Sequence, residues 1–348
     1  MRYRYHAVTH RLRAPFRVAH GASTTRTTVF AHVGDGVGEG ALVPYYPYAL
    51  EDLTGYLARI DGAAFGDGSF SLETALAAIP DGPAPARCAL DVALHDAWGK
   101  REGAPLWRLW GLDPARVPVS SFTLSIPETD EALREAVRSV AHLPVLKLKV
   151  GTGDVDADVR IVEAVRGMTQ AVLGVDANAA WSVDEAARAL PRLAEIGVLY
   201  VEQPLARGDH AAWHRLRARL PSGMPPLLAD ESVQGLDDLD ALAGAADGVN
   251  VKLTKTGGLA GARRLIDRAR AHGMRVLVGC MVESAVGVTA AAHLAPLADF
   301  ADLDGAVLLA DPAVTGGVGW NDGRLTLPDA PGVGSFAWGN PPPFGHPL

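Results

Sequence analysis

The sequence predicts an α/β protein in which a (β/α)8 barrel of the TIM type carries an α+β capping domain. Between residues 117 and 303, eight short apolar runs alternate with helix-sized segments. Charged residues follow these runs at intervals of 25 to 28 residues, at Lys149, Asp176, Glu202, Asp230 and Lys255. A strand, a crossover helix and two loops fill a unit of this length. The total of 348 residues leaves room for a second, smaller domain.

The first 112 residues are expected to form the capping domain. Thr28–Val33 has the composition of a strand, and the turn signal Gly34-Asp35-Gly36 follows it, which predicts a β-hairpin. The glycine-rich stretch is no dinucleotide loop, because no helix pattern follows it. Residues 50–80 are typical of amphipathic helices. Ala84–Gly99 has the apolar spacing of a longer, buried helix.

The barrel is expected to span residues 113–310. Its eight predicted strands are Val117–Leu124, Val145–Val150, Val172–Val175, Leu199–Glu202, Leu227–Ala229, Val249–Leu253, Val276–Val278 and Phe300–Leu303. The tail, residues 311–348, is rich in Gly and Pro and has a short strand candidate at Arg324–Leu327. We expect this tail to pack back on the capping domain.

Composition excludes several classes of partner. The net charge is −8, from 32 basic and 40 acidic residues, and there is no basic patch for nucleic acid or for an anionic membrane. No apolar run is long enough to span a membrane, and the first ten residues lack the apolar region of a signal peptide. Cys88 and Cys280 make neither a disulfide framework nor a zinc site. We therefore expect a cytoplasmic protein that acts on a small molecule, as a homo-oligomer.

Three carboxylates follow consecutive strands of the predicted barrel. Asp176, Glu202 and Asp230 end strands three, four and five, and active sites of such barrels lie at these strand ends. Unpaired, the three groups would repel one another and raise one another's pKa values. A hard divalent cation removes this conflict, and oxygen ligands favour Mg²⁺ over zinc. The alternative is that each carboxylate caps a separate helix.

Two lysines on the second strand are the candidate bases. Read with a period of two, Val145–Val150 places Lys147 and Lys149 on one face, and the alternative is an exposed edge strand with solvated lysines. Strands two and six face each other, so Lys149 and Lys255 would flank a ligand held by the metal. A second lysine and a nearby cation lower the pKa of a lysine toward that of a useful base. Two bases on opposite faces of a planar enolate are what a racemase or epimerase needs. The alternative for Lys255, beside Gly257, is a phosphate-binding loop.

Asp302 and Asp304 share one face of the eighth strand. No partner for them is evident in the sequence, which indicates a cation of the substrate, such as an ammonium group. The alternative is a helix cap and a turn residue.

With these residues in place, the chain resembles the enolase superfamily, in its muconate-lactonizing subgroup. The resemblance covers nearly the whole chain, includes the helix Ala89–Lys100, and is carried by K-x-K, D-x-N, E-Q-P, D-E-S and K-x-G-G in this order. It implies that Asp176, Glu202 and Asp230 bind Mg²⁺, and that Lys149 and Lys255 are the acid/base pair with Lys147 in support. Asn178 and Glu231, beside these ligands, are expected to support the metal site.

Within the subgroup, the sequence is most similar to dipeptide epimerases. Gly279–Ser284, Gly287–His293 and the D-x-D of Asp302 and Asp304 carry this similarity. It implies that the D-x-D holds the α-ammonium of a dipeptide, that the C-terminal carboxylate binds Mg²⁺, and that the α-carbon of the second residue is inverted. Met281 and Glu283 are expected near the substrate.

One departure concerns specificity. Ala-Glu epimerases hold the glutamate side chain with an arginine in the loop after a Pro-Phe pair, and Gly21 stands at that place here. His20 and Arg26 are the candidates to replace it, and the alternative is an ordinary solvated loop. Three other functions stay open on the same scaffold: N-acylamino acid racemisation, o-succinylbenzoate synthesis and muconate cycloisomerisation. A more remote alternative is a non-catalytic barrel that only binds ligands.

Overall fold

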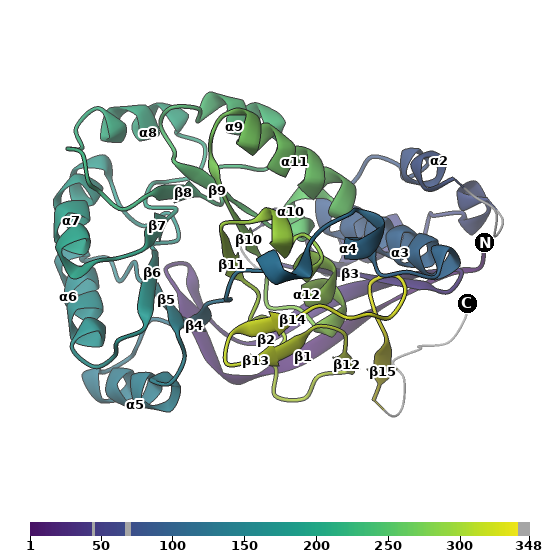
Figure 1. The fold of residues 1–348 in the computed structure, drawn as a ribbon, viewed down its shortest axis with the longest axis horizontal. Helices are drawn as coiled ribbons and strands as arrows, with labels where there is room; N and C mark the ends of the chain where they lie inside the picture. The colour runs from purple at the N-terminus through teal and green to yellow at the C-terminus, as the bar shows by residue number, and fades with distance from the viewer. Residues whose placement is uncertain (44–45, 67–70, 340–348) are drawn as a thin grey trace.

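The computed structural model describes residues 1–43, 46–66 and 71–339, and its centre is a barrel of parallel strands (Figure 1). Eight strands of this described part run in chain order around the barrel. They are β4 (Phe122–Leu124), β5 (Val145–Lys149), β6 (Val172–Asp176), β7 (Tyr200–Glu202), β8 (Leu227–Ala229), β9 (Gly248–Val251), β10 (Arg275–Gly279) and β11 (Phe300–Asp302). The ring closes where Ser121 N donates to Ala301 O at 2.9 Å. The predicted fold class and all eight predicted strands are therefore confirmed, with ends shifted by a few residues.

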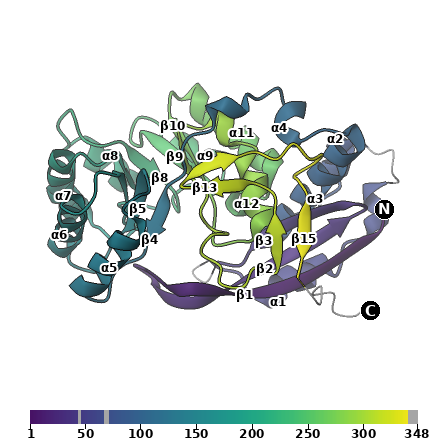
Figure 2. The ribbon, with the colours of Figure 1, turned by 60° about the horizontal axis from the view of Figure 1, so that its bottom comes forward.

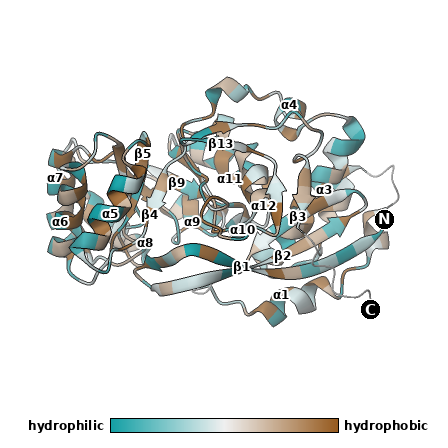
Figure 3. Cartoon of the chain, turned by 90° about the horizontal axis from the view of Figure 1, so that it is seen from below, coloured by the Kyte–Doolittle hydropathy of each residue, from teal (hydrophilic) through white to brown (hydrophobic). Residues whose placement is uncertain are grey.

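Helices on the outside of the barrel connect successive strands. They are α5 (Asp130–Val140), α6 (Val155–Arg166), α7 (Val183–Ile196), α8 (His210–Arg217), α9 (Leu236–Ala241), the short α10 (Leu253–Thr256), α11 (Leu259–Ala271) and α12 (Ala285–Ala292). Side-chain caps start several of them: Thr129 accepts from Ala132 N, and Ser182 and Glu185 form a capping box. Helix α5 buries Leu133 and Val137 and leaves a hydrophilic face outside (Figure 3).

Alternation along the strands separates two layers of side chains. On β5, Leu146 and Leu148 pack into the apolar layer between strands and helices, while Lys147 points into the barrel and is 1% exposed. Gly174 on β6 makes room inside the barrel, because a Cβ there would lie 2.6 Å from the ring of Tyr200. The barrel interior therefore combines a large aromatic side chain with a buried charge.

The capping domain is an antiparallel sheet of three strands packed on a long helix. Its elements are β1 (Tyr3–Val18), β2 (Gly21–Val33), β3 (Gly36–Ala41), α1 (Leu50–Leu57), α2 (Leu72–Ala77), α3 (Ala84–Glu102) and α4 (Leu106–Leu109). The predicted hairpin pairs Val33 with Gly36. Strand β3 lies directly on α3, and a Cβ at Gly38 would stand 2.1 Å from the carbonyl oxygen of Ala89. Only glycine permits this approach.

The tail adds four short strands: β12 (Val314–Gly316), β13 (Gly319–Asn321), β14 (Arg324–Thr326) and β15 (Phe336–Trp338). The turn between β13 and β14 lies beside the start of the barrel, where Ser120 N donates to Gly323 O at 2.8 Å. Strand β15 lies near β3 (Figure 2), and the ring of Trp338 meets that of Phe30 edge-on, with 5.2 Å between centroids. The chain thus passes from the capping domain through the barrel and back again. None of the helices in the described residues is both long and apolar enough to cross a membrane.

Candidate active site

The site is built around Lys147, whose ammonium group lies among three carboxylates at the carboxyl ends of the barrel strands. Its Nζ atom is 2.7 Å from Asp302 Oδ2, 2.7 Å from Glu202 Oε2 and 3.1 Å from Asp176 Oδ2. Burial alone would lower the pKa of Lys147, but these carboxylates raise it well above its ordinary value. Lys147 therefore keeps its proton and is not itself a base.

The three predicted metal ligands, Asp176, Glu202 and Asp230, are all buried at the ends of neighbouring strands. Burial opposes ionisation of Asp176 and Asp230, but the adjacent lysines outweigh it and hold both pKa values well below the ordinary range. The pKa of Glu202 is instead raised to about 8, by burial and then by Asp176. Glu202 Oε2 is ion-paired with Lys147 yet accepts no hydrogen bond. Across the described residues, no three His, Cys, Asp or Glu side chains surround a common point in metal-binding geometry.

Amide side chains hold these carboxylates in place. Asn250 donates to Glu202 Oε1 at 2.8 Å, and Asn178 donates to Glu231 Oε1 at 3.1 Å. Gln203 joins two strand ends, because its Oε1 atom accepts from the backbone N–H of Asp230 at 2.8 Å. Burial, followed by the charge of Asp230, raises the pKa of Glu231 to about 7. Asn178 and Glu231 are both buried and are hydrogen-bonded to each other beside the carboxylates.

Two lysines with different surroundings follow the sixth strand, β9. The ammonium group of Lys255 is enclosed, with Asp230 Oδ1 at 2.6 Å, Asp230 O at 2.7 Å and Asn250 O at 2.8 Å. Lys252 pairs with Asp230 Oδ2 at 2.7 Å and also lines the central cavity, as Lys149 does. Lys255, the base expected from the sequence, is not among the residues that line this cavity. The reason is local: β9 ends at Val251, and Lys255 lies a turn later, on α10.

Asp302 and Asp304 form another wall of the cavity, and the structure corrects the expectation that they lack partners. Asp302 accepts from Lys147 and, at 2.6 Å, from Ser121 Oγ, and Lys147 lowers the pKa of Asp302 against the effect of burial. Asp304 accepts from the backbone N–H of Thr123 at 2.6 Å. Burial and then Asp302 raise the pKa of Asp304 to about 7.

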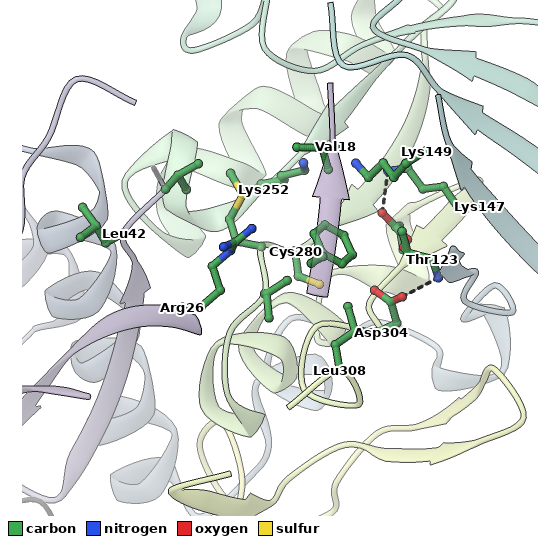
Figure 4. A pocket seen from close by; sticks show the side chains of 15 residues that line it. Val18, Arg26, Leu42, Thr123, Lys147, Lys149, Lys252, Cys280, Asp304 and Leu308 are labelled. Atoms are coloured by element: carbon green, nitrogen blue, oxygen red, sulfur yellow. Dashed lines mark hydrogen bonds and ion pairs between the residues drawn. The ribbon is translucent and has the colours of Figure 1, made fainter. Parts of the chain in front are cut away.

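The cavity lies where the capping hairpin meets the mouth of the barrel (Figure 4). Lys149 and Lys252 stand on opposite sides of the end of β1, near Val18, and Asp304 lies below Lys149 in this view. The residues around the cavity are Phe16, Val18, Arg26, Leu42, Val43, Thr123, Lys147, Lys149, Lys252, Cys280, Met281, Val282, Asp302, Asp304 and Leu308.

The four predicted substrate contacts outside the D-x-D fall into two groups. Arg26 and Met281 line the cavity, and the guanidinium group of Arg26 lies 5.9 Å from the centroid of the Phe16 ring. His20 is exposed in the turn between β1 and β2. Glu283 is buried behind the cavity, where its Oε1 atom accepts from the backbone N–H of Met281 at 2.7 Å.

Lys252 and Thr123 are the residues that sequence reasoning missed. For Lys252 a signal existed, because a period of two from Asn250 along the sixth strand places Lys252 on the inner face. For Thr123 there was none, because it lies on a short strand with no charged residue and contributes a backbone N–H to Asp304 and a hydroxyl to Asp302 at 3.5 Å.

Comparison with known proteins agrees with this geometry. Residues 131–335 match the family model described as enolase C-terminal domain-like, and residues 3–111 match the N-terminal domain of mandelate racemase/muconate lactonizing enzymes. The chain belongs to this family of the enolase superfamily.

Its relatives include several epimerases. The chain is 36% identical over 336 residues to an L-Ala-D/L-Glu epimerase of Bacteroides thetaiotaomicron, covering 93% of this chain and 85% of the relative. It is 35% identical to a hydrophobic dipeptide epimerase of Roseobacter litoralis, covering 96% and 98% of the two chains. The solved dipeptide epimerase of Methylococcus capsulatus, complexed with Mg and L-Arg-D-Lys, has a TM-score of 0.83 at 31% identity, with coverage of 96% and 98%.

Proposed function

We propose that this family member is a Mg²⁺-dependent dipeptide epimerase that inverts the α-carbon of the C-terminal residue by two-base proton transfer. One observation carries the proposal: Lys149, at the end of β5, and Lys252, directly after the opposite strand β9, line one cavity whose next wall bears Asp302 and Asp304. The epimerases among the relatives support the choice of substrate class. A cytoplasmic homo-oligomer remains part of the proposal, and sedimentation velocity tests the oligomeric state.

The donor set fits a magnesium ion. Asp176, Glu202 and Asp230 offer only carboxylate oxygens, as Mg²⁺ prefers, and they are buried at adjacent strand ends. Glu202 Oε2 accepts no hydrogen bond and has Lys147 as its ion-pair partner, so it still has a lone pair for such an ion. These three residues would hold the metal. When bound, Mg²⁺ supplies positive charge that stabilises an oxyanion.

The lysines would move the proton. One of Lys149 and Lys252, in its neutral form, takes the α-proton, and the C–H electron pair passes into the adjacent carboxylate to give a planar enolate. The other, as an ammonium group, returns a proton to the opposite face, which inverts the centre. Lys147 keeps its charge beside the carboxylates and stays a positioning residue. We propose Lys252 in the role expected of Lys255, because only Lys252 of the two lines the cavity.

The D-x-D favours a substrate with a free ammonium group over N-acylated amino acids and muconates. Asp304 lines the cavity, and its Oδ2 atom accepts from the N–H of Thr123. The buried pair Asp302 and Lys147 presents a second carboxylate beside it.

The test is α-proton exchange in D₂O, followed by NMR with Mg²⁺ and both stereoisomers of a dipeptide library. Lys149→Ala and Lys252→Ala are each expected to abolish epimerisation. Each variant should still exchange the α-proton of one stereoisomer, one variant that of the L isomer and the other that of the D isomer. Lys255→Met serves as the matched comparison. It is expected to slow α-proton exchange of both isomers equally, because Lys255 only positions Asp230.

Three outcomes would contradict the proposal. Exchange of no dipeptide would leave a binding protein, and equal turnover of N-acylamino acids would favour racemisation of acylated substrates. Stereoselective loss in Lys255→Met with unchanged Lys252→Ala would return the second base to Lys255.

A further inference from the structure

A second cavity, on the far side of Phe16 from the lysines, is the strongest feature that the proposed function leaves unused. Its volume is about 530 Å³, against about 60 Å³ for the catalytic cavity. It lies between β1, the segment that follows β4, helix α5 and the loop after β11. Its walls are mostly apolar, and include Leu124, Ile126, Leu133 and Val140. The two cavities share Phe16, Thr123 and Leu308 in their walls, so they are adjacent.

The wall that β1 contributes is fixed along both edges. On one side Ile126 N donates to Arg17 O at 3.0 Å, and Arg17 forms an ion pair with Glu128. On the other side Arg13 N donates to Leu308 O at 2.9 Å, and Arg13 Nε donates to Val307 O at 2.8 Å. The cavity is therefore preformed, so an occupant does not need to order a loop before it binds.

The position of the carboxylates decides which part of a dipeptide reaches this cavity. An ammonium group on Asp304 lies beside Thr123, at the boundary that the two cavities share. From that α-carbon the peptide bond must run toward Lys149 and Lys252, where the second residue reacts. The side chain of the first residue is then the substituent left to extend past Phe16 and Leu308.

We propose that this second cavity is the subsite for the side chain of the N-terminal residue, and that the preferred substrates carry a large apolar residue there, such as leucine or phenylalanine. This inference rests on the proposed epimerase activity. The lining is mostly apolar. Of its charged members, Arg17 and Glu128 are paired with each other, and Arg13 donates to the carbonyl oxygen of Val307. An apolar side chain gains by leaving water here, while a charged one would lose hydration against walls that are mostly apolar.

The experiment compares kcat/KM for α-proton exchange across Gly, L-Ala, L-Leu and L-Phe as first residue, in two series with L-Ala or L-Glu as second residue. We expect kcat/KM to rise about 10- to 100-fold from Gly to Leu, as is typical of an apolar pocket. Ala136→Phe, which fills the cavity from α5, should reduce turnover of Leu and Phe substrates at least 10-fold and change Gly substrates less than about 2-fold. Ala132→Phe, at a more exposed lining position, repeats the test should Ala136→Phe not fold.

Ala141→Phe is the matched control, because Ala141 is exposed at the end of α5 and does not line the cavity. Equal kcat/KM for Gly and Leu substrates would overturn the subsite while leaving the epimerase intact. The subsite would also be overturned if the loss of kcat/KM in Ala136→Phe depended on the second residue of the dipeptide rather than on the first. Absence of exchange with every dipeptide would instead overturn the proposed function itself.

Discussion

Replacing Glu39 with alanine is expected to loosen the contact between the capping domain and the barrel. Glu39 lies on β3, is fully buried, and accepts three hydrogen bonds from the start of α12: Ser284 N at 2.9 Å, Ser284 Oγ at 2.5 Å and Gly287 N at 2.8 Å. The substitution leaves two buried N–H groups without an acceptor, at about 1–3 kcal/mol each. It also relieves the repulsion between Glu39 and Glu283. We therefore expect a net loss of about 2–4 kcal/mol in the free energy of unfolding.

Urea unfolding followed by tryptophan fluorescence measures this loss, and kcat/KM measures its effect on the site. Activity should fall as well, because the segment that Glu39 fixes continues into Met281 and Val282, which line the catalytic cavity. Glu39→Gln keeps one acceptor oxygen and should lose less. Glu135→Ala, at an exposed position of α5, is the control and should stay within about 0.5 kcal/mol. A loss in Glu39→Ala no larger than in this control would refute the reasoning.

Three further predictions follow from the same structure. Burial, reinforced by Glu39, raises the pKa of Glu283 to about 8, so the folded protein holds a proton that the unfolded chain releases near pH 4.5. The free energy of unfolding should therefore fall as the pH rises from 5 to 8, and urea unfolding should show a smaller fall in Glu283→Gln. Because the pKa of Asp304 is raised to about 7, KM for dipeptides should decrease from pH 6 to 7.5 as this carboxylate ionises. Asp304→Asn should raise KM about 10-fold and remove this pH dependence, and an unchanged KM in this variant would exclude the ammonium contact. Mg²⁺ should raise the thermal unfolding midpoint of the wild type and EDTA should reverse the rise, whereas Asp230→Asn should respond to neither.

Much of the barrel could be predicted because its strands repeat one pattern. A buried parallel strand needs an apolar run, and a carboxylate after the run marks the mouth, so Asp176, Glu202 and Asp230 could be placed by spacing alone. Spacing did not distinguish Lys252 from Lys255, because where a strand ends and a short helix begins depends on backbone hydrogen bonds rather than on composition. The alternation of inner and outer residues, counted from Asn250, would have been the better guide.

Contacts between distant segments were beyond the sequence. Lys147 and Asp302 are 155 positions apart, and only closure of the barrel brings them to 2.7 Å. The same holds for the second cavity, whose walls come from three separate parts of the chain, within residues 12–17, 122–140 and 307–308. His20 and Arg26 were both predicted to contact the substrate. The strand pairing leaves the side chain of His20 exposed, whereas Arg26 lines the cavity.

The close approach of β3 to α3 has a consequence for exchanging parts between relatives. Every second residue of β3 is a glycine, and a Cβ at Gly36 or Gly40 would stand about 2 Å from a carbonyl oxygen of α3, as at Gly38. Because no layer of side chains lies between them, the distance between β3 and α3 is fixed. The same helix carries Asp91, whose Oδ1 atom accepts from Leu259 N at 2.6 Å, at the start of α11 and only a few residues beyond Lys252. The tip of the β1–β2 hairpin can therefore be exchanged alone, whereas β3 and α3 must be exchanged as a unit if Lys252 is to keep its position.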